Sequence, residues 1–177
     1  MRVVSGKYKG KRFNPPSKFP SRPTTDFAKE ALFNILENEY ELENLNVLDL
    51  FAGTGNISLE FLSREAGTVT SIDENSNCIR FLAKMKKELN DSNWIIIKSD
   101  VFKFLNETNQ KSDIIFADPP FDMPDQKRIP NIVFERNLLA ENGLLIVEHG
   151  RENNFENITH FRELRNYGGV CFSFFEH

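Results

Sequence analysis

Short apolar runs alternate with helical patterns through most of the chain, and this alternation limits the possible folds more than any other sequence feature. The expected strands are residues 47–51, 69–73, 94–98, 114–117 and 144–147. Two of the expected helices span about 75–90 and 129–139. A third has Ile57, Phe61 and Leu62 on its inward face and stops before Gly67, and a short fourth helix holds Phe102 and Leu105. Strands that are apolar throughout and separated by helices are typical of a parallel sheet covered on both faces. The sequence therefore predicts an α/β fold.

Two further segments complete the expected architecture. Thr24-Thr25 can cap a helix over about 26–37, which must bury its apolar stripe against a larger surface. That stripe consists of two columns at i, i+4 spacing, namely Phe27, Ala31 and Ile35, and Ala28, Leu32 and Leu36. Near the end of the chain, 159–166 and 170–175 flank Tyr167-Gly168-Gly169, which predicts an antiparallel hairpin. We expect a mostly parallel seven-stranded sheet with helices on both faces and a C-terminal antiparallel hairpin.

Length and composition favour an ordinary globular protein. The 177 residues suit one domain, 1–177, which we divide into a basic N-terminal arm (1–23) and a core (24–177). Cys78 and Cys171 are too few for a disulfide scaffold or a cysteine zinc site, and no metal site is expected. No apolar run approaches the roughly 18 residues of a membrane span, and the first residues lack a secretory signal. We expect a cytoplasmic protein without membrane contact.

Charge is unevenly distributed along the chain. The net charge is −4, but residues 1–30 carry eight Lys or Arg and two acids, which makes that segment +6 and the remainder −10. A basic arm on an acidic body commonly binds phosphate, as in nucleic acid. The alternative interpretation of this segment is a solvated leader without a partner.

Acidic residues stand at the end of every expected parallel strand. They are Asp49, Asp73, Asp100, Asp118 and Glu148. In open α/β sheets, ligands bind beyond the carboxyl ends of the strands. Any one of these acids could simply cap a helix, but five acids at one edge of the sheet predict a ligand site there.

The turn after the first strand, Gly53-Thr54-Gly55, lets a ligand approach the backbone closely. It could be half of a dinucleotide fingerprint, although Ser58 occupies the third glycine position. Asp73 follows Gly55 by 18 residues, where a ribose-binding acid is expected. This half of the site therefore predicts a ligand that contains adenosine and leaves its identity open.

Asp118-Pro119-Pro120-Phe121 predicts the second half of the site. The two prolines remove backbone donors, so the turn presents carbonyl oxygens beside the Asp118 carboxylate. Such a group of acceptors suits an NH2 group, and Phe121 can stack on the ring that carries the amine. The alternative is a plain turn that closes a strand.

The motifs LDLFAGTG, SIDEN, SDVFKFL and DPPF, in this order, resemble those of Rossmann-like class I S-adenosylmethionine-dependent methyltransferases that act on amines. With GKYKGKRF and SRPTTDFAKEALFNIL, nearly the whole chain is similar to the RsmD family of bacterial 16S ribosomal RNA guanine-N2 methyltransferases. The resemblance implies S-adenosyl-L-methionine as cofactor and small-subunit ribosomal RNA, or an assembling small ribosomal particle, as partner of a monomeric enzyme.

The resemblance also implies a role for each matching residue. The cofactor-binding residues would be Asp49, Phe51, Gly53 and Gly55 around the methionine part, Asp73 at the ribose, and Asp100 and Val101 at the adenine. The catalytic residues would be Asp118, Pro119, Pro120 and Phe121. The RNA-binding residues would be Lys7, Lys9, Lys11, Arg12, Arg22 and Thr24.

Three rival interpretations remain. A nicotinamide-dependent oxidoreductase would explain Gly53, Gly55 and Asp73, but not the Asp118 turn or the basic leader. The same chemistry could act on another amine, in a different RNA, in DNA adenine or in a protein amide. A non-catalytic binding protein would tolerate the loss of Asp118. His149 could serve as a general base, although a methylated amine loses its proton readily without one.

Overall fold

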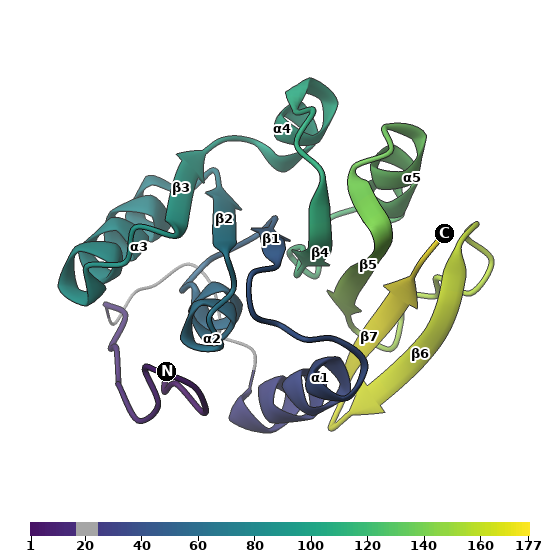
Figure 1. The fold of residues 1–177 in the computed structure, drawn as a ribbon. Coiled ribbons are helices and arrows are strands. Elements are labelled where there is room, and N and C mark those ends of the chain that lie inside the picture. The colour runs from purple at the N-terminus through teal and green to yellow at the C-terminus, as the bar shows by residue number, and fades with distance from the viewer. Residues whose placement is uncertain (17–24) are drawn as a thin grey trace.

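The computed structural model describes residues 1–16 and 25–177, in which seven strands form one sheet in the order β3-β2-β1-β4-β5-β7-β6 (Figure 1). The strands are β1 (Asn46–Asp49), β2 (Thr68–Asp73), β3 (Trp94–Lys98), β4 (Ser112–Ala117), β5 (Leu139–His149), β6 (Phe161–Tyr167) and β7 (Val170–Phe175). The first five pair in parallel, whereas β7 is antiparallel to both β5 and β6. The predicted parallel sheet and C-terminal hairpin are confirmed.

Five helices cover the two faces of this sheet within the described residues. They are α1 (Asp26–Glu39), α2 (Asn56–Ser63), α3 (Ser76–Leu89), α4 (Val101–Glu107) and α5 (Arg128–Glu135). Figure 1 shows α1, α2 and α3 on one face and α4 and α5 on the other. No described helix is long and apolar enough to cross a membrane.

The central strands are apolar throughout because each of their faces packs into a separate hydrophobic cluster. On β4, Ile114 and Phe116 face the cluster beneath α1, α2 and α3, while Ile115 and Ala117 face the cluster beneath α4 and α5. Successive side chains of a strand point to opposite faces, so continuous apolar sequence is required wherever both faces are covered.

Three local expectations differ from the structure. The edge strand β3 pairs only with β2, so Ile95 is 42% exposed rather than buried. The helix expected over 129–139 ends at Glu135, because Asn137 has a φ of 52°, and β5 then begins at Leu139. In α1, Phe27 lies in the first turn and is 66% exposed.

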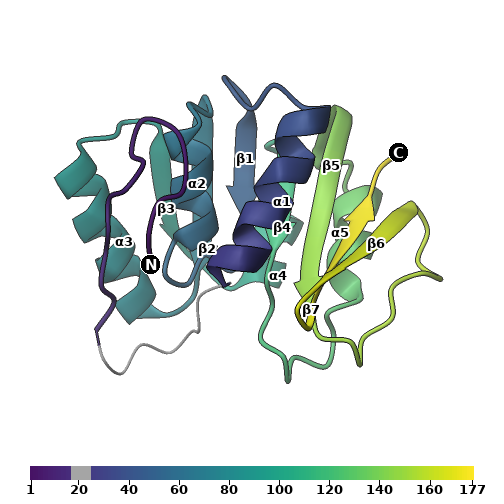
Figure 2. The same ribbon diagram turned by 90° about the horizontal axis from the view of Figure 1, so that it is seen from below.

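The leader packs against α2 as part of the core. Arg2 and Arg12 form an antiparallel bridge, and Val3 and Phe13 belong to the hydrophobic cluster beneath α1, α2 and α3. At the tip of this loop, the Lys7 N–H donates to the carbonyl of Ser63, the last residue of α2, at 2.7 Å. The described part of the expected arm, residues 1–16, thus packs on the core, and the expected boundary at residue 23 lies outside the described residues. The loop runs alongside α2, and Figure 2 shows its tip at the edge where the parallel strands begin.

A buried charged cluster joins the leader, α1 and α2. Lys29 of α1 is 1% exposed, and its Nζ donates to the Arg2 carbonyl at 2.6 Å, to Asn56 Oδ1 at 2.8 Å and to Glu60 Oε1 at 2.9 Å. Glu60 also accepts from the Val4 N–H at 2.7 Å and pairs with the guanidinium of Arg64. Each buried charge therefore has an opposite charge and hydrogen-bond partners, as burial of ionic groups requires.

Candidate active site

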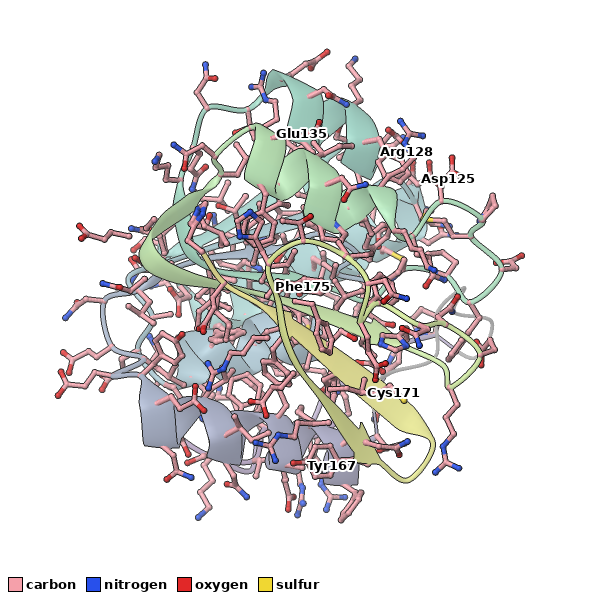
Figure 3. The ribbon with its side chains drawn as sticks, turned by 90° about the vertical axis from the view of Figure 1, so that its right-hand side faces the viewer. Asp125, Arg128, Glu135, Tyr167, Cys171 and Phe175 are labelled. Atoms are coloured by element: carbon pink, nitrogen blue, oxygen red, sulfur yellow. The ribbon has the colours of Figure 1, made fainter. Side chains whose placement is uncertain are left out.

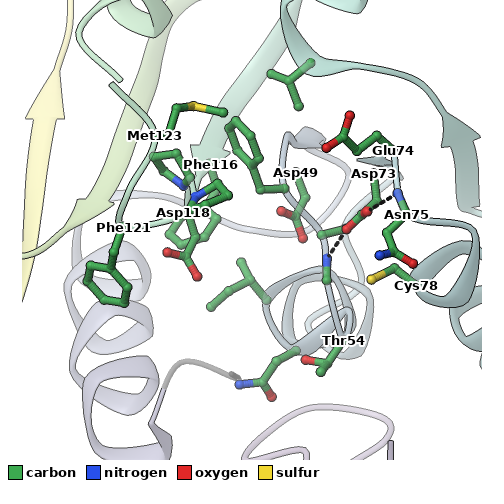
Figure 4. A pocket seen from close by; sticks show the side chains of 18 of the residues that line it. Asp49, Thr54, Asp73, Glu74, Asn75, Cys78, Phe116, Asp118, Phe121 and Met123 are labelled. Atoms are coloured by element: carbon green, nitrogen blue, oxygen red, sulfur yellow. Dashed lines mark hydrogen bonds between the residues drawn. The ribbon is translucent and has the colours of Figure 1, made fainter. Parts of the chain in front are cut away.

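A cavity of about 480 Å³ opens at the carboxyl ends of the parallel strands (Figure 4). Its lining is contributed by the segments that follow β1, β2, β3 and β4. These residues are Asp49, Phe51, Ala52, Gly53, Thr54, Asn56, Ile57, Asp73, Glu74, Asn75, Cys78, Asp100, Val101, Phe116, Asp118, Pro119, Pro120, Phe121, Asp122 and Met123. The structure thus brings together all the predicted cofactor and catalytic residues except Gly55.

The lining is strongly acidic. It includes Asp49, Asp73, Glu74, Asp100, Asp118 and Asp122 and, among the described residues, neither Lys, Arg nor His. Carboxylates in a partly enclosed site attract cations and repel phosphates. The cavity therefore suits a ligand that carries positive charge better than one that carries a pyrophosphate.

Asp49 is the most deeply buried of these acids. Its Oδ2 accepts a hydrogen bond of 2.5 Å from Ser58 Oγ, whereas its Oδ1 is buried without a partner in the described part of the chain. Burial raises the pKa of Asp49 to about 7, against the lowering effect of the Ser58 hydrogen bonds. An orphaned carboxylate oxygen in a cavity is a ready acceptor for a cationic N–H group, so the site fits the ammonium of an amino acid.

Asp73 shapes the glycine turn. Its Oδ2 accepts from the Gly53 N–H at 2.8 Å and its Oδ1 from the Asn75 N–H at 2.7 Å (Figure 4). The turn amide of Gly53 therefore points at a carboxylate, which argues against phosphate binding in the manner of a dinucleotide fingerprint. Gly55 lies behind the turn with a φ of +74°, and a Cβ there would stand 2.5 Å from Leu82 Cδ2. Gly55 shapes the packing of the turn and does not line the cavity.

Asp100 and Val101, which were predicted to lie beside an adenine, are at the start of α4 and line the cavity. The Asp100 side chain caps the helix by accepting from the Lys103 N–H at 2.7 Å, and Val101 is buried. The simple capping interpretation of Asp100 is thus correct. Capping uses one lone pair of Oδ1 and leaves the carboxylate able to accept further hydrogen bonds.

Asp118 and the turn that follows it form the other side of the cavity, away from Asp73 and Cys78 in Figure 4. Burial raises the pKa of Asp118 well above its usual value, and the neighbouring carboxyls of Glu148 and Asp49 raise it further. A cation bound among these acids would lower the same pKa and favour the ionised form. Phe121 is 70% exposed at the mouth of the cavity.

The two proline carbonyls are not equivalent. The Pro120 carbonyl accepts from Gln126 Nε2 and from the Met123 N–H, both at 2.9 Å. Among the described residues, no hydrogen bond reaches the Pro119 carbonyl. Pro119 and Asp118 are therefore the acceptors that remain for an amine, and Pro120 holds the turn in place.

His149 does not line the cavity. It is buried, with Nδ1 2.8 Å from the Gly150 carbonyl and Nε2 2.7 Å from Ser173 Oγ. Burial lowers the pKa of His149, which favours the neutral ring. The hydrogen bonds make it a link between β5 and β7 rather than a general base.

The predicted RNA-binding residues of the leader lie elsewhere. Lys7 Nζ pairs with Asp91 at 3.1 Å, and the side chains of Lys7 and Lys11 lie over the ring of Tyr8. Lys9, Lys11 and Arg12 are exposed. The backbone N–H groups of Lys7 and Tyr8 donate to Ser63, the last residue of α2, whereas Asn56 at the first turn of α2 lines the cavity. The 8 residues of α2 make this helix about 12 Å long, which separates the tip of the leader from the cavity. Arg22 and Thr24 lie outside the described residues, and Thr25 caps α1.

Sequence reasoning missed two residues that support the site. Gln126 fixes the Pro120 carbonyl from within the 122–127 loop, and Asn56 lines the cavity while accepting from the buried Lys29. For Asn56 a signal existed, because it directly follows the glycine turn. For Gln126 there was none, since a glutamine in a polar loop resembles any surface residue. Within the described chain, no group of three His, Cys, Asp or Glu side chains could hold a metal ion.

Comparisons with known proteins agree with this geometry. A family model described as Conserved hypothetical protein 95 matches residues 1–176. Ribosomal RNA small subunit methyltransferase D of Buchnera aphidicola subsp. Baizongia pistaciae is 34% identical over 148 residues, which cover 84% of this chain and 75% of the relative. The protein of the same name from Escherichia coli K12 is 32% identical over 153 residues, covering 86% and 76%.

A solved structure extends the similarity to three dimensions. The Escherichia coli protein yhhF, described as a methyltransferase candidate, superposes with a TM-score of 0.85 at 28% sequence identity. The match covers 99% of this chain and 96% of that protein. Overall architecture is thus shared along the full length of both chains.

Proposed function

Since the chain belongs to the family of the ribosomal RNA small subunit methyltransferase D proteins, we propose that it transfers a methyl group from S-adenosylmethionine to the N2 amine of a guanine in small-subunit ribosomal RNA. One observation carries the proposal beyond the family relationship. The cavity is lined by six acidic residues and, among the described residues, by no Lys, Arg or His. On one side of it lies a turn in which Asp118 and the Pro119 carbonyl are the acceptors not used by hydrogen bonds among the described residues. That arrangement suits a cationic donor and an NH2 acceptor in one site.

The chain's own residues fit this cofactor. The unpartnered Oδ1 of Asp49 can accept from the ammonium of the methionine part, and Asp73 can accept from ribose hydroxyls with its remaining lone pairs. Asp100 and Val101 provide an acceptor and an apolar surface for the adenine. When bound, S-adenosylmethionine supplies a methyl group on a positively charged sulfur.

The Asp118 turn performs the other half of the reaction. An exocyclic amine is a weak nucleophile because its lone pair is delocalised into the ring. Asp118 and the Pro119 carbonyl can hold the two amine hydrogens and direct the lone pair into the cavity, while Phe121 stacks on the base. Asp118 then disperses the positive charge that develops on the nitrogen and can take up the released proton. Holding amine and methyl donor together removes most of the entropic barrier to the displacement.

The substrate is inferred to be an assembling small ribosomal particle. A guanine amine can enter the cavity only when its base is unpaired. The basic tip of the leader stands at the opposite edge of the sheet from the cavity, so an RNA that touches both must follow the side of α2. Such a path favours a structured RNA surface over a flexible strand.

Two measurements test the cofactor and the substrate separately. Calorimetric titration is expected to give binding of S-adenosylhomocysteine and none of NADH; the reverse result would contradict the proposal and favour the oxidoreductase. Methyl transfer is then compared on hypomethylated small particles and on bare 16S transcript. Faster transfer to particles is expected, and equal rates would refute the particle as the substrate.

A further inference from the structure

A row of polar side chains interrupts the apolar layer between the sheet and α2. Asp49 of β1 and Ser71 of β2 are register partners, so both point to the face of the sheet that packs under α2. Ser58 of α2 meets them there, and the indole of Trp94 on β3 completes the row. All four side chains are at most 1% exposed and lie within the hydrophobic cluster beneath α1, α2 and α3.

Three hydrogen bonds join these four side chains end to end. Trp94 Nε1 donates to Ser71 Oγ at 2.7 Å, and the hydroxyl oxygens of Ser71 and Ser58 lie 2.6 Å apart. Ser58 Oγ donates to Asp49 Oδ2 at 2.5 Å. An indole N–H can only donate, whereas a carboxylate can only accept. All three bonds therefore form together when every hydrogen points from Trp94 toward Asp49.

This direction determines which oxygen of Asp49 is left for a ligand. Oδ2 receives the hydrogen of Ser58, whereas Oδ1 has no hydrogen-bond partner among the described residues. In Figure 4 the Asp49 carboxylate lies between the Asp118 side and the Asp73 side of the cavity. Because one oxygen is held by Ser58, the plane of the carboxylate is fixed, and the other oxygen is offered to a bound group in one orientation.

Packing alone would not require polar groups in this layer. A buried hydrogen bond contributes little net stability, since it replaces one to water, and apolar side chains of the same shape can take the place of both partners at little cost. The row of hydrogen bonds instead leads from the edge strand β3 to a carboxylate that lines the cavity. Its position thus indicates a role in the site.

We propose that Ser58, Ser71 and Trp94 are positioning residues that orient the Asp49 carboxylate for the ammonium in the methionine part of the cofactor. This inference rests on the proposed function, in which Asp49 accepts from that ammonium. None of the three positioning residues lines the cavity, so each acts through its neighbour in the row.

The test compares two ligands that differ in the amino-acid part alone. S-adenosylhomocysteine carries the ammonium, whereas 5′-methylthioadenosine has a methyl group on the sulfur in place of the whole amino-acid chain. Calorimetry gives the Kd of both ligands for the parent, Ser58→Ala, Ser71→Ala and the double variant. A change that disturbs the packing of the site weakens both ligands, whereas a change that acts through Asp49 weakens only the ligand with the ammonium.

Ser173→Ala is the matched control. Ser173 is likewise a fully buried strand serine whose hydroxyl meets an aromatic ring nitrogen, His149 Nε2 at 2.7 Å. It lies on β7 between Cys171 and Phe175, in the C-terminal hairpin (Figure 3), and does not line the cavity. Its replacement therefore removes the same atoms from the same kind of environment without touching Asp49.

We expect Ser58→Ala to raise the Kd of S-adenosylhomocysteine about tenfold, as the loss of a hydrogen-bond partner behind a ligating residue does at metal sites. Ser71→Ala should raise it by a smaller factor, because Ser58 can still donate to Asp49. The double variant should bind like Ser58→Ala, since Ser71 acts only through Ser58. All variants should bind 5′-methylthioadenosine like the parent, and Ser173→Ala should bind both ligands like the parent.

Three results would overturn the positioning role. An unchanged Kd of S-adenosylhomocysteine in Ser58→Ala or in Ser71→Ala would show that Asp49 does not depend on the row. Equal losses for both ligands would show that the serines only support the packing of the site. Additive losses in the double variant would show that Ser71 does not act through Ser58. A parent that binds no S-adenosylhomocysteine would instead refute the proposed function itself.

Discussion

Replacing the buried Lys29 by methionine removes the centre of the cluster that joins the leader to α1 and α2. Lys29 Nζ makes three contacts of 2.6–2.9 Å, to the Arg2 carbonyl, Asn56 Oδ1 and Glu60 Oε1. Glu60 keeps its pairing with Arg64, so no carboxylate is left without a cation. Methionine retains most of the apolar stem, so the variant should fold.

The expected loss is large for a single side chain. A hydrogen bond from a charged group contributes about 1.5–3 kcal/mol, so three of them give at least about 4.5 kcal/mol. Removing a buried ammonium also relieves its desolvation, which returns part of that sum. We expect Lys29→Met to lower the free energy of unfolding by about 3 kcal/mol, a substantial part of the roughly 5–15 kcal/mol typical of a domain.

Urea denaturation at pH 7, followed by tryptophan fluorescence, measures this loss. Trp94, the only tryptophan, is fully buried and serves as the reporter. Lys98→Met is the control, because the exposed Lys98 donates, among the described residues, to Ser76 alone, and its loss should cost under about 0.5 kcal/mol. A loss below about 1 kcal/mol in Lys29→Met, or equal losses in both variants, would refute the view that this cluster holds the leader in place.

Three further predictions follow from the site. Gly55→Ala should destabilise the protein by about 2–4 kcal/mol in urea denaturation, because the positive φ of Gly55 and the nearby Leu82 side chain of α3 both oppose a Cβ. Gly10→Ala is the control: Gly10 also has a positive φ but open space around it, so the change should cost about 1 kcal/mol. The pKa of Asp49 is raised to about 7, so between pH 4 and 7 the folded state holds a proton that the unfolded state has released. The free energy of unfolding should therefore fall from pH 4 to 7 and level off above pH 7. Asp49→Asn should flatten this part of the stability–pH profile, and an unchanged slope would contradict the assignment to Asp49. Asp118→Ala should abolish methyl transfer while calorimetry still detects S-adenosylhomocysteine, and retained turnover would favour a non-catalytic role.

The sheet was predictable because its determinants are local. Apolar runs, helical spacing and the Tyr167-Gly168-Gly169 turn predict the parallel strands and the hairpin. Four of the five strand-end acids line the cavity, namely Asp49, Asp73, Asp100 and Asp118, whereas Glu148 does not. The predicted end of the helix over 129–139 was wrong, because Asn137 adopts a left-handed conformation that stops the helix. An asparagine can also adopt helical φ and ψ angles, so its presence in the sequence does not by itself mark the end of a helix. Strand order also decides burial, so the exposure of Ile95 could not be read from its apolar sequence.

The supporting contacts of the site were not predictable, because they join residues far apart in the chain. A lysine in a charged helix such as α1 normally faces solvent, and nothing in the sequence indicates that Lys29 meets Glu60 and the Arg2 carbonyl in the interior. The leader's basic composition indicated phosphate binding, but not that its tip docks on Ser63 at the far end of α2. Partner choice in such contacts depends on tertiary packing rather than on local pattern.

Methyl transfer to small ribosomal particles tests most directly whether the Asp118 turn presents a guanine amine to S-adenosylmethionine. Hypomethylated small ribosomal particles are incubated with the protein and methyl-labelled S-adenosylmethionine, and the RNA is digested to nucleosides and separated. We expect label in N2-methylguanosine with the parent and none with Asp118→Ala. Label in N6-methyladenosine, or in N2-methylguanosine with Asp118→Ala as well, would contradict it.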